Sequence, residues 1–198
     1  MPPVSASSVR SSAVLLVLAV FVTAFFRDPF REIPQGPGLV VSPADGKVVL
    51  IVPTPAGHPA GDGSTQISIF LSVFDVHINR APIAGTITDV VYNKGEFLPA
   101  FDDKASLRNE QNRVFIDGPE GRVGFTQIAG LIARRIVFRK KAGDVVARGE
   151  RVGLIRFGSR TDVFLPSGST LKVKVGDRVS GGRSVIAHLP DPRKAAGS

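Results

Sequence analysis

Two similar stretches of sequence decide the fold: Ala142-Gly-Asp-Val-Val-Ala-Arg-Gly-Glu-Arg-Val-Gly-Leu-Ile155 and Val175-Gly-Asp-Arg-Val-Ser-Gly-Gly-Arg-Ser-Val-Ile186. Each begins with a Gly-Asp pair, which favours a tight turn, and continues into a short run with β-branched residues. A later glycine predicts a second turn, after which another strand follows. A weaker copy is Pro82-Ile-Ala-Gly-Thr-Ile-Thr-Asp-Val90, followed by Lys94-Gly-Glu96. The repeated pattern predicts hairpins of short strands.

The rest of the chain after Leu39 consists of short apolar runs separated by Gly, Pro and Asp. Runs of this length with β-branched residues predict strands. The expected strands are Lys47–Val52, Gln66–Leu71, Arg113–Ile116, Arg135–Phe138, Arg151–Ile155, Asp162–Leu165 and the strictly alternating Leu171–Val175. The polar stretch from Leu98 to Asn112 predicts either a short helix or a long active-site loop. We therefore expect a mainly β sandwich, similar to the barrel-sandwich hybrid of biotinyl and lipoyl carrier domains, plus one apolar N-terminal helix.

An uncharged apolar run from Ala13 to Phe26 precedes this domain. As a helix it spans about 21 Å, which is less than the ~30 Å hydrocarbon core of a bilayer. Three interpretations are open: a signal peptide cut after Val22-Thr-Ala24, a short or tilted spanning anchor, and a monotopic anchor lying in the interface. A retained anchor is favoured, and Arg27 and Arg31 favour a cytoplasmic location for the β-rich domain.

The expected organisation is a membrane-anchor segment of residues 1–34, a β-rich domain of residues 35–190 and a tail of residues 191–198. The 198-residue chain has no cysteine, which excludes disulfides, thiolate nucleophiles and Cys-based metal sites. Its net charge of +8 favours an anionic partner. One tyrosine, no tryptophan and no zinc-finger or RNP-type motif argue against nucleic acid. The expected partner is therefore an anionic membrane surface.

Only three histidines are available as general acid–base groups. His77 lies in Asp75-Val-His-Ile-Asn-Arg80, at the end of an expected strand and between a carboxylate and a guanidinium. His58 lies in a Gly/Pro-rich loop, and His188 lies near the end of the last expected strand. Asp45 is a further candidate, although the Asp-Gly pair that it begins is also explained by a turn. His77 is the strongest of these groups.

Five separate segments carry a family resemblance: Phe26-Arg-Asp-Pro29, Ser42-Pro-Ala-Asp-Gly46, Asp75-Val-His77 with Pro82, Gln127-Ile-Ala-Gly-Leu-Ile-Ala-Arg-Arg-Ile136 and Gly149-Glu-Arg-Val-Gly-Leu-Ile-Arg-Phe-Gly-Ser159. In this order they closely resemble the short, bacterial and archaeal type of phosphatidylserine decarboxylase. The resemblance runs from about Phe25 to about Leu189. Any one segment is weak evidence, whereas five in register are specific.

The resemblance implies a membrane-bound lyase that converts phosphatidylserine to phosphatidylethanolamine. Such a proenzyme cuts itself between Gly158 and Ser159, because the Ser159 hydroxyl attacks the preceding carbonyl. Elimination and hydrolysis then leave a covalent pyruvoyl cofactor, which takes up electrons when CO₂ leaves; no metal is expected. The fragments, residues 1–158 and 159–198, are expected to stay associated. The ether lipid archaetidylserine carries the same head group and is an alternative substrate.

The resemblance also implies roles for individual residues. Asp45 matches an aspartate that assists self-cleavage, and His77 matches a histidine linked to decarboxylation. A second histidine of longer family members is replaced here by Arg80, and arginine cannot act as a general base at ordinary pH. The base for self-cleavage is therefore open: His77 serves both steps, Asp45 acts with a water, or His58 or His188 folds into the site.

A polar motif, Arg108-Asn-Glu-Gln-Asn-Arg113, matches a stretch that we expect to border the lipid head-group site. Asn109, Arg113 and Arg80 are the expected substrate-binding residues. The main rival function is a membrane-tethered carrier or adaptor without catalysis, because Asp102-Asp-Lys-Ala105 is similar to the Asp-Lys-Ala of lipoylated hairpins. The oligomeric state is open, and a homo-oligomer is an alternative to the monomer.

Two further Gly-Ser pairs compete as cleavage sites, Gly63-Ser64 and Gly168-Ser169. Both precede threonine, as the Gly-Ser pair of longer family members does. The first lies in a polar loop, and the second is expected in a hairpin turn. Gly158-Ser159 lies between two apolar strands that can hold a carbonyl and a hydroxyl rigidly, so this pair is the predicted cleavage site.

Overall fold

The computed structural model describes residues 6–95, 109–130, 136–155 and 158–190, with side chains from Arg10 onward. Its one described helix is α1 (Ala6–Phe25). The strands are β1 (Leu39–Val41), β2 (Gly46–Pro53), β3 (Thr65–Leu71), β4 (Ile78–Arg80), β5 (Gly85–Asn93), β6 (Gln111–Gly118), β7 (Gly121–Ala129), β8 (Ile136–Phe138), β9 (Val145–Val146), β10 (Arg151–Ile155), β11 (Ser159–Leu165), β12 (Thr170–Leu171), β13 (Arg178–Val179) and β14 (Val185–His188). The predicted mainly β domain with one N-terminal helix is confirmed.

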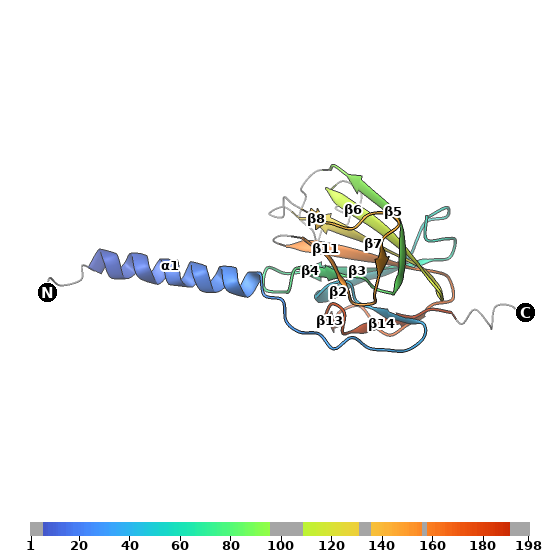
Figure 1. The fold of residues 1–198 in the computed structure, drawn as a ribbon, viewed down its shortest axis with the longest axis horizontal. Helices are drawn as coiled ribbons and strands as arrows, with labels where there is room; N and C mark the ends of the chain where they lie inside the picture. Colours follow the sequence, from blue (N-terminus) through green and yellow to red (C-terminus); the bar gives the residue numbers. More distant parts are fainter. Residues whose placement is uncertain (1–5, 96–108, 131–135, 156–157, 191–198) are drawn as a thin grey trace, which may run out of the picture.

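An eight-stranded sheet forms the body of the domain, in the order β13-β2-β3-β11-β7-β6-β5-β9. All neighbouring strands in it are antiparallel. Two three-stranded sheets, β1-β14-β12 and β4-β10-β8, pack around it. Buried aliphatic and aromatic side chains from one face of the large sheet form the main core, among them Ile67, Ile69, Phe125 and Val163. Strand β11 lies at the middle of this arrangement, and α1 projects from one end of the domain (Figure 1).

The two predicted repeats form the two edges of the large sheet. β9 pairs with β5 at one edge, and β13 pairs with β2 at the other. An aspartate closes the turn before each edge strand: the Lys141 amide donates to Asp144 and the Lys174 amide donates to Asp177, both at 3.0 Å. The Gly-Asp pattern in the sequence therefore corresponds to a repeated turn that starts an edge strand.

One expected strand is wrong in its extent, because Leu171–Val175 is a strand only at its first residue, in β12. The Lys172 amide still donates to the Ile186 carbonyl, at 2.9 Å. Beyond this bond the chain turns, and the Lys174 amide donates to the Asp177 carboxylate instead of a neighbouring strand. The turn chemistry of the Gly-Asp pair thus ends the strand earlier than the side-chain alternation predicts.

Helix α1 carries apolar side chains all around from Ala13 onward. Its exposed large apolar side chains are Val14, Leu15, Leu16, Val17, Leu18, Val20, Phe21 and Val22. Within the described residues, no helix combines the length and the apolarity needed to cross a membrane. The segment after α1 runs along the β domain, where Arg148 donates to the carbonyls of Pro34, at 3.1 Å, and Gly36, at 2.8 Å. This segment brings the charged residues that follow the helix against the domain.

Candidate active site

Strand β11 begins at Ser159, in the centre of the large sheet. Ser159 lies opposite Leu71 of β3 on one side and Ala129 of β7 on the other. Its side chain is fully buried, and its Oγ has no hydrogen-bond partner among the described residues. Leaving a buried hydroxyl unpaired costs roughly 1–3 kcal/mol, so such a group in a native protein calls for a functional explanation. The strand thus holds a hydroxyl whose proton and lone pairs are uncommitted, as a nucleophile requires.

The residue before this serine, Gly158, has a φ of +56°, in the left-handed region. Apart from its chain neighbours, no atom of the described residues lies within 4 Å of the position that its Cβ would take. The backbone conformation, and not crowding, therefore favours glycine here. The chain enters the central strand through a conformation that other residues adopt only at a cost of about 1–2 kcal/mol.

His77 precedes β4 and is 3% exposed. Its Nδ1 lies 2.8 Å from the carbonyl oxygen of Asp75, and its Nε2 is buried without a partner in the described part of the chain. Burial is the largest influence on its pKa and lowers it, and Arg27 acts in the same direction, whereas Asp75 and Asp45 raise it. A neutral ring that donates from Nδ1 to Asp75 leaves an unprotonated Nε2. This nitrogen can accept a proton.

The backbone brings His77 and the Gly158-Ser159 bond to the same end of the molecule. β10 runs antiparallel to β4 and ends at Ile155, whose amide donates to the His77 carbonyl at 3.2 Å. β11 then starts at Ser159, opposite Leu71, the last residue of β3. The loop from Leu71 to His77 therefore adjoins both strands that flank the predicted cleavage site.

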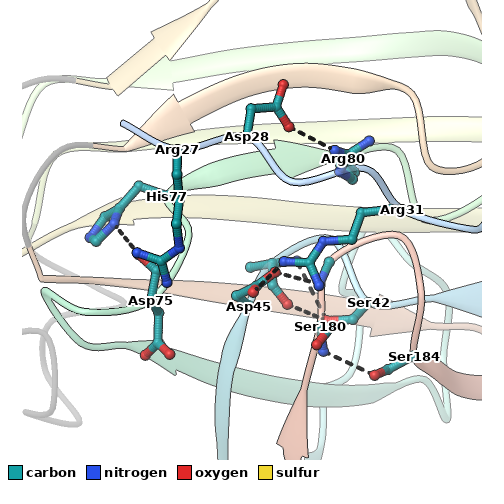
Figure 2. A network of polar contacts seen from close by, with 12 residues as sticks. Arg27, Asp28, Arg31, Ser42, Asp45, Asp75, His77, Arg80, Ser180 and Ser184 are labelled. Carbon is teal, nitrogen blue, oxygen red and sulfur yellow. Dashed lines mark hydrogen bonds and ion pairs between the residues drawn. The ribbon is translucent and has the colours of Figure 1, made fainter. Parts of the chain in front are cut away.

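Asp45 lies in the turn before β2, and both of its carboxylate oxygens accept a bond. Arg31 donates to one oxygen at 2.7 Å, and the Gly181 amide donates to the other at 2.7 Å. Figure 2 shows the Arg31 and Asp45 side chains pointing toward each other. Asp45 is near enough to His77 for its charge to raise the pKa of the imidazole. Because both oxygens of Asp45 already accept hydrogen bonds, this carboxylate is better suited to stabilise a nearby positive charge than to accept a proton.

Arg80, one of the expected substrate-binding residues, has a nearly buried guanidinium. It donates to the Gly149 carbonyl at 2.9 Å and to Asp28 at 3.1 Å (Figure 2). Burial lowers its pKa, mainly against the opposing influence of Asp28. Asp28 also pairs with Arg151 at 2.6 Å. Arg80 therefore connects the segment after α1 with β4 and β10, and its donors are used within the protein.

The structure separates the other two expected binding residues. The Asn109 side chain is buried and donates at 2.7 Å to the carbonyl of Ala129, the residue opposite Ser159. Arg113 pairs across β6 and β7 with Thr126, whose side chain alternates to the other face of the sheet from Ser159. Asn109 thus lies near the predicted cleavage site, whereas Arg113 does not share its face.

A line of buried polar side chains beside the site was not found from the sequence. Gln127 donates to the Asn79 side chain at 2.9 Å, and Asn79 donates to Thr161 at 3.3 Å. These bonds connect β4 of a small sheet with β7 and β11 of the large one. Asn79 lies two residues after His77, and Thr161 lies two residues after Ser159. Residues two apart in an extended chain face the same side, so this spacing places Asn79 beside His77 and Thr161 beside Ser159.

The competing residues are committed elsewhere. The Ser64 hydroxyl shares a hydrogen bond with Thr54, and the Ser169 hydroxyl donates to the Pro166 carbonyl at 2.7 Å. His58 packs on Phe164, with ring centroids 4.5 Å apart. In the described chain, no group of three or more His, Asp or Glu side chains is placed to hold a metal ion. Lys104, the carrier-type lysine, lies outside the described residues.

Comparisons with known proteins show the family of the chain. The phosphatidylserine decarboxylase family model matches residues 18–187. A phosphatidylserine decarboxylase proenzyme of Novosphingobium aromaticivorans is 54% identical over 188 residues, covering 88% of this chain and 75% of the relative. The phosphatidylserine decarboxylase proenzyme of Zymomonas mobilis is 53% identical, over 90% of this chain and 76% of the relative. That of Solibacter usitatus is 54% identical, over 89% of this chain and 83% of the relative. The chain therefore belongs to the phosphatidylserine decarboxylase family.

Proposed function

We propose that this protein is a self-processing decarboxylase that converts phosphatidylserine to phosphatidylethanolamine, with Ser159 as the source of a pyruvoyl group. Membership of the family makes the chain a carboxy-lyase. The observation that carries the proposed site is a pair of buried atoms without a hydrogen-bond partner among the described residues, Ser159 Oγ and His77 Nε2. Ser159 starts β11 opposite Leu71, and the loop from Leu71 leads to His77, so a nucleophile and a base come to the same end of the domain.

Self-cleavage starts with proton transfer from Ser159 Oγ to His77 Nε2. The oxygen attacks the Gly158 carbonyl carbon, the imidazolium of His77 returns its proton to the Ser159 nitrogen as the peptide C–N bond breaks, and an ester joins the two residues. Loss of the Ser159 α-proton then breaks the Cβ–Oγ bond and releases the Gly158 carboxylate. One water hydrolyses the remaining dehydroalanine, which loses ammonia and leaves a pyruvoyl group at residue 159. The products are residues 1–158 and 159–198.

His77 is the base that the geometry favours for this step. It has an accepting nitrogen without a partner in the described part of the chain, while both oxygens of Asp45 already accept bonds. His58 packs against Phe164, whose side chain alternates to the sheet face away from Ser159. His188 belongs to β14, in a separate sheet. Asp45 then assists by stabilising the imidazolium that forms on His77.

The pyruvoyl group fits the position of Ser159, because the residue starts a fully buried strand and no other hydrogen bond of its hydroxyl to the described residues has to be broken. This group supplies a ketone that draws off the electrons released when CO₂ leaves. His77 can hold a proton at Nε2 and return it to the carbon that has lost CO₂, so one side chain serves both steps.

The two fragments stay associated after cleavage because of where β11 lies. The small fragment contributes β11, β12, β13 and β14 to two sheets. β11 alone pairs over its whole length with β3 and over six residues with β7, both of the large fragment. Separating the fragments would expose this buried strand and the core around it, which is far less favourable than keeping them together.

A retained membrane anchor completes the proposal. From Ala13 onward α1 exposes apolar side chains all around, which suits a lipid environment better than water. Phe25, its last residue, is buried and lies 4.3 Å from the His77 ring, centroid to centroid. The helix is therefore joined to the site, as a retained segment would be and a removable leader would not. We place the domain on the cytoplasmic side, following Arg27 and Arg31.

Intact-mass spectrometry of the purified protein tests the site. The wild-type chain is expected as two fragments, with the smaller beginning in pyruvoyl, whereas Ser159→Ala should remain a single chain of 21.0 kDa. A carrier function instead predicts one modified chain. Cleavage of Ser159→Ala at the same bond would overturn the assignment.

His77→Ala separates the roles of the imidazole. A single uncut chain is expected if His77 is the base for self-cleavage. A cut but inactive protein would restrict His77 to decarboxylation and return the first step to Asp45 and a water. His58→Ala is the matched control, because His58 lies away from the site, and it should be cut like the wild type.

A further inference from the structure

Phe74 is a large apolar side chain that the fold leaves 75% exposed. It lies in the turn between β3 and β4, directly before the site residues Asp75 and His77. The turn is held closed, because the amide and the hydroxyl of Ser72 both donate to the Asp75 carboxylate, at 2.9 and 2.7 Å. The Asp75 amide donates back to the Ser72 carbonyl at 3.1 Å. A rigid turn thus presents the phenyl ring outward.

The same turn is tied to the end of the apolar helix. The Arg27 guanidinium donates to the Ala24 carbonyl in α1 and to the Phe74 carbonyl, both at 2.7 Å. Two more phenyl rings in the segment after the helix are exposed, Phe26 at 50% and Phe30 at 92%. The turn of Phe74 therefore lies next to the end of α1. The helix projects from one end of the domain (Figure 1).

We propose that the Phe74 turn is a second membrane contact, which inserts its ring into the lipid surface beside α1 and brings the active site to the head groups. The inference rests on the proposed function, because only an enzyme with a lipid substrate gains from this placement. A helix that exposes apolar side chains on all sides places its own end at the bilayer, and Arg27 keeps Phe74 at that end. A phenyl ring beside an arginine suits the interface, as in interfacial segments that bury Phe and keep basic side chains in the head-group layer.

The charges around the turn agree with a lipid partner. The one carboxylate in the turn, Asp75, is neutralised by Arg178 at 2.6 Å. The Arg178 side chain itself stays 70% exposed. Because Arg178 balances Asp75, the Arg27 guanidinium leaves a net positive charge beside the exposed ring, which favours the surface of anionic lipids. An exposed ring in a purely structural turn would need neither the basic neighbours nor the link to the helix.

The chain contains no tryptophan, so Phe74→Trp creates a single fluorescent reporter at this site. The probe is vesicles of phosphatidylcholine and phosphatidylglycerol, with and without brominated acyl chains. The matched control is Val145→Trp, at a similarly exposed apolar position on β9, at the edge of the sheet. We expect a blue shift and quenching by brominated lipid for Phe74→Trp alone. Equal quenching of both variants, or of neither, would overturn the proposal.

A second measurement compares phosphatidylserine in vesicles with a short-chain phosphatidylserine that is dissolved as monomers. Phe74→Ser should lower the ratio of vesicle to monomer activity by about tenfold, as expected when one phenyl ring leaves an apolar phase. Phe74→Leu should restore most of it, and Val145→Ser should leave the ratio unchanged. An unchanged ratio in Phe74→Ser contradicts the membrane contact. Absence of activity and of cleavage in the wild type would contradict the proposed function instead, while the fluorescence test would still decide the contact.

Discussion

The two edges of the large sheet are built alike, but only one of them carries a residue of the site. At one edge β2 pairs with β13, and at the other β5 pairs with β9. The Val48 amide donates to the Asp177 carbonyl just as the Ile87 amide donates to the Asp144 carbonyl, both at 2.9 Å. The strands β2 and β5 also begin at equivalent glycines. Asp45, before the first of these glycines, takes the place that Ala84 has at the other edge.

The difference between the edges separates scaffold from chemistry. The features that both edges share, the glycines and the turn aspartates, are needed to start and end strands. The carboxylate of Asp45 occurs at one edge only, and there Arg31 and the Gly181 amide hold it beside the region of His77. Changes at shared positions should therefore affect stability equally at both edges, whereas changes at Asp45 should affect self-cleavage.

The largest effect is expected from making the first edge like the second. Asp45→Ala should slow self-cleavage by about a hundredfold, because it removes a negative charge that favours the imidazolium on His77 and leaves the Arg31 guanidinium without this partner. The reverse change, Ala84→Asp, places a carboxylate at an exposed position of the other edge and should leave cleavage at the wild-type rate. A time course of freshly translated chain on a denaturing gel measures both. Wild-type cleavage by Asp45→Ala would show that the carboxylate serves only the turn.

A smaller but equal effect is expected from the two glycines that start β2 and β5. A Cβ on Gly46 would lie 2.2 Å from the Phe70 carbonyl oxygen, and one on Gly85 would lie 2.3 Å from that of Asp117. Each alanine substitution should therefore lower the free energy of unfolding by about 3 kcal/mol. Urea unfolding of the uncut Ser159→Ala chain measures it. Gly176→Ala is the control for backbone strain, because Gly176 also has a positive φ, of +101°, but no neighbouring atom of the described residues lies within 4 Å of its Cβ position. It should lose less, about 1–2 kcal/mol; a loss as large as that of the other two would contradict the steric explanation.

The shared scaffold could be predicted from the sequence, since turns at Gly-Asp are local and repeat along the chain. The partners of Asp45 could not be, because Gly181 is 136 residues away and only the folded sheet brings its amide to the carboxylate. The contact of Phe25 with His77 is hidden for the same reason. Asn79 and Thr161 could have been suspected, because each lies two residues after a candidate site residue, His77 or Ser159. Polar residues are common in strands, however, so this spacing alone does not distinguish them from residues without a role in the site.

A third comparison concerns the aspartates that close the two turns. Asp144→Ala and Asp177→Ala each remove one hydrogen bond, from the Lys141 and the Lys174 amide, at the same distance of 3.0 Å. Both should lower the free energy of unfolding by about 1 kcal/mol. The midpoint of urea unfolding, again on the uncut Ser159→Ala chain, reports the change. A loss at one edge that clearly exceeds the other would show that the repeat is not equivalent in energy.

The smallest expected effect is the influence of the Asp45 charge on the pKa of His77. Burial lowers the pKa of the imidazole, and the charge of Asp45 raises it. The ring should therefore stay neutral in the wild type somewhat below its ordinary pKa and become protonated only as the pH falls further. Asp45→Asn removes the opposing charge, so protonation should need a still lower pH, while Ala84→Asp should leave the titration unchanged. The His77 ring proton signal in an NMR titration of the uncut Ser159→Ala chain, which has only three histidines, measures the shift. If the pKa of His77 rises in Asp45→Asn, Asp45 acts on the imidazole through Arg31 rather than through its own charge. The feature that distinguishes the first edge of the sheet would then be the Arg31–Asp45 ion pair and not the carboxylate alone.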